Sequence, residues 1–80
     1  MDIDPDGPVP VYIQIADAIQ ARIEHGDYPT GRRIPSESAL QQESGTARAT
    51  VRHAVDELRR RGLVYTVPMR GTFVGKPERT

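Results

Sequence analysis

Two stretches of the chain repeat apolar residues every three or four positions, which is the spacing of a helix that buries one face. The first of these helices is predicted to start after Pro10 and to stop at Gly26, since glycine favours the left-handed conformation of helix ends. Its buried stripe consists of Tyr12, Ile15, Ala16, Ile19 and Ile23. This stripe predicts one side of a small core.

The second periodic stretch predicts a longer helix over about residues 47–61. Thr46 is a plausible N-cap for it, and Gly62 follows its end. Its buried stripe consists of Val51, Ala54, Val55 and Leu58. Because this face must point inward, the remaining face of the helix is predicted to be exposed.

A short helix is predicted between these two, in the segment "PSESALQQESG". Pro35 and Ser36 favour a helix start and Gly45 favours a helix end, which leaves Leu40 as the main apolar anchor. A helix this short is stable only when it packs against other elements.

The pattern changes after Gly62. The runs "LVYTV" and "TFVG" are rich in β-branched and aromatic residues, and "PMRG" between them is typical of a turn. They predict a two-stranded hairpin whose Phe73 packs into the core. The predicted fold class is therefore mainly α with a small β-hairpin (α+β), in which three helices plus a two-stranded wing form a winged helix-turn-helix.

The 80 residues suffice for one small domain. We expect that domain over residues 8–75, after a flexible acidic N-terminal tail (1–7) and before a polar tail or the start of a linker (76–80). The chain has no cysteine and only two isolated histidines, so we expect no metal and no other cofactor. No signal peptide and no apolar run of membrane-spanning length are present, which favours a cytoplasmic protein with no membrane partner.

Charge is distributed unevenly, although the net charge is zero. Residues 1–31 contain one basic and six acidic residues, and residues 32–80 contain ten basic and five acidic residues. This asymmetry predicts one basic face that could attract a polyanion. Arg48 and Arg52 lie four residues apart on the exposed start of the helix at 47–61, where each could grip phosphate or make a bidentate contact with guanine.

The neighbouring polar residues extend this hypothesis. Thr50 could serve a phosphate or a base, and Arg70 and Gly71 at the wing tip, in the wing at about 68–72, would approach the narrow minor groove. The arrangement predicts sequence-specific binding of double-stranded DNA, with the helix at 47–61 in the major groove. The run of Arg59, Arg60 and Arg61 has a competing role, because cations stabilise the negative end of a helix dipole.

Four segments closely resemble the DNA-binding domain of the GntR family of bacterial transcription regulators, especially its HutC-like branch: "PVYIQIADAIQARI", "GRRIPSESAL", "ARATVRHAVDELRRRGLV" and "RGTFV". The resemblance implies DNA contacts from the starts of the second and third helices and from the wing. It therefore adds Arg33, Ser36 and Glu37 to the DNA-binding candidates, although Glu37 could simply complement the positive start of its helix. Three positions depart from the family pattern. Ser38 stands where the family often has arginine, Ala47 where it often has serine or threonine, and Ala49 where it often has a polar residue.

The resemblance also implies an inverted-repeat operator, a possible homodimer on DNA and, more often than not, a repressor. Family members usually continue into a larger domain that binds an effector, so no effector is expected to bind this chain. Whether the chain is part of a longer protein or naturally short is left open. An alternative is a winged-helix protein-interaction module without sequence-specific DNA binding, which an exposed apolar patch would favour. An enzyme is not expected, because no catalytic spacing is recognisable.

Overall fold

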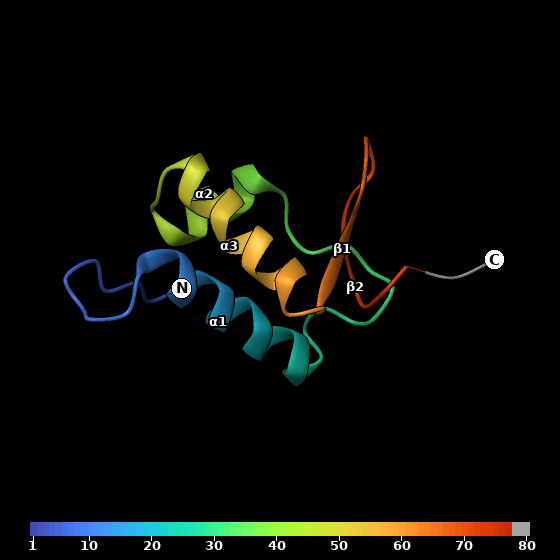
Figure 1. Ribbon diagram of the computed structural model, residues 1–80, viewed down its shortest axis with the longest axis horizontal. Coiled ribbons are helices and arrows are strands. Elements are labelled where there is room, and N and C mark those ends of the chain that lie inside the picture. The colour runs from blue at the N-terminus through green and yellow to red at the C-terminus, as the bar shows by residue number, and fades with distance from the viewer. Residues whose placement is uncertain (78–80) are drawn as a thin grey trace.

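The computed structural model describes residues 1–77 and contains three helices followed by a two-stranded hairpin (Figure 1). The elements in chain order are α1 (Val11–His25), α2 (Glu37–Ser44), α3 (Arg48–Arg60), β1 (Val64–Val67) and β2 (Gly71–Val74). Helix α3 packs against both α1 and α2, and the hairpin follows its C-terminal end. The predicted fold class, mainly α with a small hairpin, is confirmed.

The ends of α1 and α2 follow the signals in the sequence. Gly26 and Gly45 have left-handed φ angles of 93° and 69° and end the two helices. The hydroxyl of Ser36 caps α2, because it accepts a hydrogen bond of 3.1 Å from the amide of Ala39. These individual residues were therefore sufficient to predict the C-terminal ends of α1 and α2 and the start of α2.

The start of α3 differs from the prediction. Ala47 occupies the N-cap position and supplies no side-chain hydrogen bond, so the predicted cap at Thr46 is wrong. The Thr46 hydroxyl lies instead 2.7 Å from the hydroxyl of Ser44, in the turn between α2 and α3. Helix α3 is also one residue shorter at each end than the predicted helix at 47–61.

The core lies between the three helices and the base of the hairpin. Both predicted stripes contribute to it, and the second of them is buried throughout. The buried apolar residues are Ile15, Ala16, Ile19, Ile34, Leu40, Val51, Ala54, Val55, Leu58, Val64 and Val74. Leu40 has no exposed surface, which confirms it as the anchor of α2.

Strands β1 and β2 pair antiparallel, with Val64 opposite Val74 and Val67 opposite Gly71. The segment before α2 joins the other edge of β2, because the Ile34 amide donates to the Thr72 carbonyl and the Val74 amide to the Arg32 carbonyl, both at 2.9 Å. Strand β2 is therefore paired on both edges, with β1 on one side and with the segment before α2 on the other.

Phe73 is half-buried, so its predicted place in the core is wrong. It pairs with Tyr65, and the two rings stack with their centroids 5.7 Å apart. Adjacent positions of a strand face opposite sides of the sheet. Because Val64 and Val74 take the inward face, Tyr65 and Phe73 stack on the other face.

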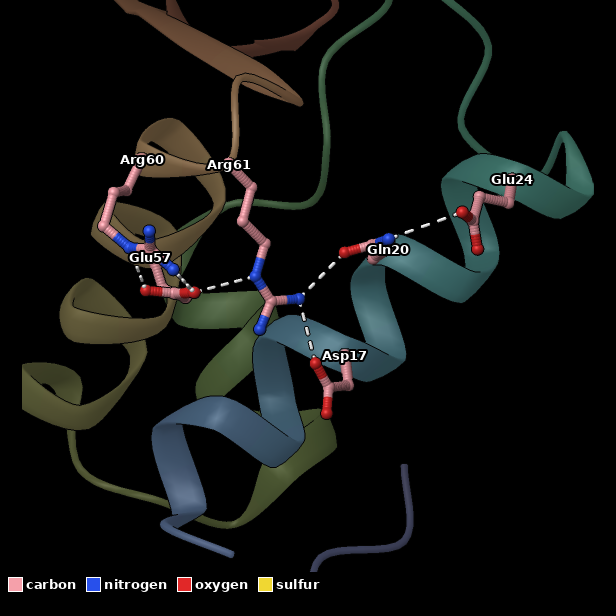
Figure 2. Close-up of polar contacts among 6 residues, drawn as sticks. All are labelled: Asp17, Gln20, Glu24, Glu57, Arg60 and Arg61. Carbon is pink, nitrogen blue, oxygen red and sulfur yellow. Dashed lines mark hydrogen bonds and ion pairs between the residues drawn. The ribbon is translucent and has the colours of Figure 1, made fainter.

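An ionic brace, formed by Glu57 and Arg60 of α3, Arg61, and Asp17 and Gln20 of α1, ties the end of α3 to α1 (Figure 2). The Arg61 guanidinium lies 2.8 Å from the Glu57 carboxylate, 2.9 Å from that of Asp17 and 2.8 Å from the Gln20 amide oxygen. Arg60 makes a bidentate pair with Glu57 at 2.7 and 2.8 Å. Hydrogen bonds from Arg60 and Arg61 lower the pKa of Glu57 to about 2, so this nearly buried carboxylate is ionised at neutral pH.

The segment at 1–7, expected to be flexible, makes contacts in the structure. The Gln14 side chain accepts from the Asp4 amide at 2.8 Å and donates to the Asp4 carbonyl at 2.7 Å, while Met1 and Ile3 pack against the core. The domain boundaries at residues 8 and 75 stay predictions. Of the polar tail predicted at 76–80, residues 78–80 lie outside the described residues.

Candidate nucleic-acid interface

A cleft of about 940 Å³ lies between the hairpin and the helices α2 and α3. Figure 1 shows α2 and the hairpin tip on one side of the molecule and α1 on the other. The charged residues that line the cleft are Arg33, Arg48, Arg52, Arg59, Arg70, Glu37 and Asp56. Five arginines against two carboxylates give this concave surface a positive potential, which supports the predicted basic face.

Arg48 and Arg52 project from the first two turns of α3, and each side chain is more than half exposed. Both approach Glu37 at the start of α2: the Arg52 Nε lies 3.3 Å from its carboxylate and the Arg48 Nε lies 3.9 Å away. The Arg48 Nε also donates to the Gln41 amide oxygen at 3.3 Å. These residues form the arginine cluster: Arg48, Arg52, Glu37 and Gln41.

Ser36 and Thr50, two further candidates, differ in position. Ser36 is exposed and lines the cleft, and its hydroxyl can still donate while it accepts from the α2 amide. Thr50 is half-buried on α3 and is not among the residues that line the cleft. Ser36 therefore lies in the same cleft as the arginine cluster, whereas Thr50 does not line this cleft.

The wing brings together the three remaining candidates, Arg33, Arg70 and Gly71, at the opposite wall of the cleft. The Arg33 guanidinium donates to the Arg70 carbonyl at 3.3 Å. Gly71 has a φ of 126°, and a Cβ atom there would lie 3.0 Å from the Arg33 side chain. Gly71 belongs to β2 rather than to the turn, and its missing side chain leaves room for the Arg33 stem.

Sequence reasoning missed Arg59 as a residue of the cleft. Its guanidinium hydrogen-bonds the Thr66 hydroxyl of β1 and pairs with Asp56, so it links α3 to the hairpin. The signal was present, because Arg59 follows Arg52 by seven residues and therefore lies on the same face of the helix. Arg60 and Arg61, by contrast, belong to the brace on the α1 side, where they pair with carboxylates that the helix-dipole interpretation did not predict.

Within residues 1–77, no group of three or more His, Asp or Glu side chains is close enough to hold a metal ion. No helix in the same part of the chain combines the length and apolar character needed to cross a bilayer.

Three helices, a hairpin wing and an arginine-lined cleft between them define a winged helix-turn-helix domain. Residues 11–74 match the family described as "Bacterial regulatory proteins, gntR family", which is most of the chain. The chain therefore belongs to the GntR family.

Curated relatives agree with this assignment. The HTH-type transcriptional repressor NagR of Bacillus subtilis is 37% identical over 78 residues, which are 98% of this chain and 32% of that protein. The histidine utilization repressor of Pseudomonas putida is 38% identical over 91% of this chain and 29% of its own length. The chain thus spans about a third of the length of the curated relatives it matches.

Solved structures share the fold. AraR(DBD) in complex with operator ORX1 is 34% identical with a TM-score of 0.84, over 94% of this chain and 96% of that chain. YtrA from Sulfolobus acidocaldarius, a GntR-family transcription factor, is 31% identical with a TM-score of 0.82, over 96% of this chain and 81% of its own. The winged-helix fold is thereby confirmed by comparison as well as by its elements.

Proposed function

We propose that this chain is the DNA-binding part of a bacterial transcription repressor of the GntR type, which acts on double-stranded DNA in the cytoplasm. The observation that carries this proposal is the cleft, where five arginines converge from α3, the wing and the segment before α2. Relatives named as repressors and the related AraR(DBD) in complex with operators support it.

Helix α3 enters the major groove by its N-terminal turns, which is the usual docking of a helix-turn-helix. Arg48 and Arg52 then reach guanines or phosphates, and Glu37 accepts a hydrogen bond from a cytosine amino group. Ser36 and Thr50 donate to backbone phosphates, which fix the register of the helix on the duplex.

The wing approaches the adjacent minor groove. Arg70 follows the narrow groove of an A·T run, where the negative potential is strongest, and Arg33 supports it through the Arg70 carbonyl. Gly71 keeps the backbone close to the Arg33 stem. Two copies of the domain bind the half-sites of an inverted-repeat operator as a homodimer on DNA, since two-fold operators mirror two-fold proteins.

The test has two stages. Selection of bound sequences from random duplex DNA should enrich one motif or an inverted repeat of it, and gel-shift titrations should then compare this duplex with a scrambled one. Affinity for the selected duplex should fall steeply with salt, with a log–log slope of about −0.9 for each neutralised phosphate. If no sequence is enriched from the random duplexes, or if affinity for DNA does not change with salt concentration, the proposal is contradicted and a protein-interaction module is favoured.

A further inference from the structure

The tip of the wing presents an apolar side chain to solvent. Met69 is fully exposed, with a relative accessibility of 104%. Val9 is the other large apolar residue exposed in the described part of the chain. A single exposed apolar residue needs no explanation by itself. Met69, however, lines the mouth of the cleft beside Arg70, and its backbone is strained.

The strain comes from the turn that closes the hairpin. The Arg70 amide donates to the Val67 carbonyl at 3.0 Å, with Pro68 and Met69 as the two central residues. Met69 has a φ of 68°, and among residues 1–77 it is the one non-glycine residue with a positive φ. Pro followed by a positive φ is typical of a type II turn, where glycine or asparagine is favoured at the second central position. The sequence therefore places a long apolar side chain where the backbone favours glycine.

The surrounding contacts hold this tip in one position. The Thr66 and Thr72 hydroxyls lie 2.9 Å apart across the hairpin, and Arg33 donates to the Arg70 carbonyl. The strand pairing on both edges of β2 continues this support toward the core. A preorganised tip loses little conformational freedom on binding, so its apolar side chain can act at a fixed place.

We propose that Met69 is a minor-groove wedge, which inserts between two base pairs beside the major-groove contacts of α3. This inference rests on the proposed function. Apolar side chains at such positions, methionine among them, unstack a base step and kink the duplex. The thioether is unbranched and polarizable, so it suits a narrow groove, while Arg70 lies beside it in the same minor groove, where the negative potential attracts its charge.

The wedge has a consequence for sequence preference. Unstacking costs least at pyrimidine–purine steps such as TA and CA/TG, so the operator should carry one of these steps under each wing tip. This preference arises from the deformability of the step rather than from hydrogen bonds to its bases.

The experiment uses the 80-residue chain and a duplex that the chain itself selects from a random pool. 2-Aminopurine replaces the adenines of the flanking step one at a time, since its fluorescence rises when a base unstacks. Wild-type protein should raise this fluorescence. Met69→Gly should cause no rise in fluorescence and should lower affinity roughly 5- to 150-fold, the cost of about one mismatched base pair.

Two further variants separate the wedge from a general effect on the wing. Met69→Leu keeps an apolar side chain and should retain most of the fluorescence change. Arg70→Ala should lower the salt slope by about one unit, whereas Met69→Gly should leave the slope unchanged because it removes no charge. Thermal unfolding of Met69→Gly should occur at no lower temperature than that of the wild type, since glycine adopts the positive φ without strain.

Equal affinity and equal fluorescence for wild type and Met69→Gly would overturn the wedge while leaving DNA recognition by α3 intact. Loss of binding in Met69→Leu as large as in Met69→Gly would also overturn it. Failure of the wild-type chain to select any duplex would instead count against the proposed function itself.

Discussion

Arginines on α3 differ in how firmly their carboxylate partners hold them. Arg60 and Arg61 pair with Glu57 at 2.7–2.8 Å, and the Glu57 side chain is only 9% exposed. Arg48 and Arg52 pair with Glu37 at 3.3–3.9 Å, and the Glu37 side chain is 41% exposed. Exposed pairs of this kind contribute about 0–1 kcal/mol, so DNA can replace Glu37 as their partner at small cost.

The first prediction concerns these two arginines. Arg48→Ala and Arg52→Ala should each weaken binding to the selected duplex by ~1–3 kcal/mol if the guanidinium makes a bidentate contact with a base. Arg32→Ala removes the same charge at an exposed position that neither lines the cleft nor belongs to the brace, so it serves as the matched control. Titration of the three variants on selected and scrambled duplexes measures the effect. Unchanged affinity in both cluster variants would rule out α3 as the recognition helix.

The second prediction separates attraction from discrimination. Glu37→Gln removes a negative charge from the cleft, so binding to a scrambled duplex should become stronger. Preference for the selected duplex should nevertheless fall by ~1–2 kcal/mol, because an amide no longer favours a cytosine amino group and no longer holds the two arginines by charge. Titrating both duplexes at one salt concentration tests this. A parallel rise in both affinities would mean that Glu37 acts only by its charge.

At the scale of elements, sequence periodicity was sufficient for what local physics controls. The stripe of α3 and the glycines that end α1 and α2 were read from spacing and turn residues, and their positions are confirmed. The face of Phe73 could not be predicted from the sequence, because both faces of the strand carry apolar residues. The pairing of Val64 with Val74 decides which face points inward. The cap of α3 was predicted one residue too early, and the Thr46 hydroxyl contacts the Ser44 hydroxyl at 2.7 Å instead.

The candidate site shows the same division. The spacing of Arg48 and Arg52 predicts a shared face, and the structure places both in one cleft. Their partner Glu37 lies 15 residues before Arg52, so only the packing of α2 on α3 brings the two together. The link from Glu57 through Arg61 to Asp17 likewise depends on the position of α1, although the spacing of Glu57 from Arg60 and Arg61 was visible in the sequence.

The third prediction uses the empty cap of α3. Ala47 has the extended backbone of an N-cap (φ −70°, ψ 157°) but no side-chain acceptor, so Ala47→Ser should add a hydrogen bond to a free amide of the first turn. The free energy of unfolding should rise by ~0.5–1 kcal/mol. Urea denaturation measures this. Ala49→Ser, which introduces the same hydroxyl inside the helix, should give no such gain, and equal effects at both positions would contradict the capping argument.

At the scale of the whole molecule, basic groups outnumber acidic groups in the cleft but not around the brace. The cleft has five arginines and two carboxylates, whereas on the opposite side α1 contributes Asp17 to the brace and carries Glu24 next to it (Figure 2). This separation explains how a chain of zero net charge presents a basic surface. The ionic brace then joins the two sides, because Arg61 at the end of α3 reaches Asp17 and Gln20 of α1. A cluster outside the cleft therefore links the end of α3 to α1.

The fourth prediction follows from the protonation of that brace. The pKa of Glu57 is lowered from 4.5 to about 2 in the folded protein, chiefly by hydrogen bonds from Arg60 and Arg61. Because the unfolded chain binds this proton more readily, the stabilisation from Glu57 is complete above about pH 4.5 and is lost as the pH falls toward 2. The free energy of unfolding, measured by denaturation at a series of pH values, should therefore decrease through this window.

Glu57→Gln keeps the shape of the side chain but cannot titrate, so it should be less stable than the wild type at neutral pH and its curve should be flatter between pH 4.5 and 2. The two curves should approach one another at the acid end, where the wild-type carboxylate is protonated as well. Parallel curves over the whole range would show that the acid sensitivity arises from groups other than Glu57.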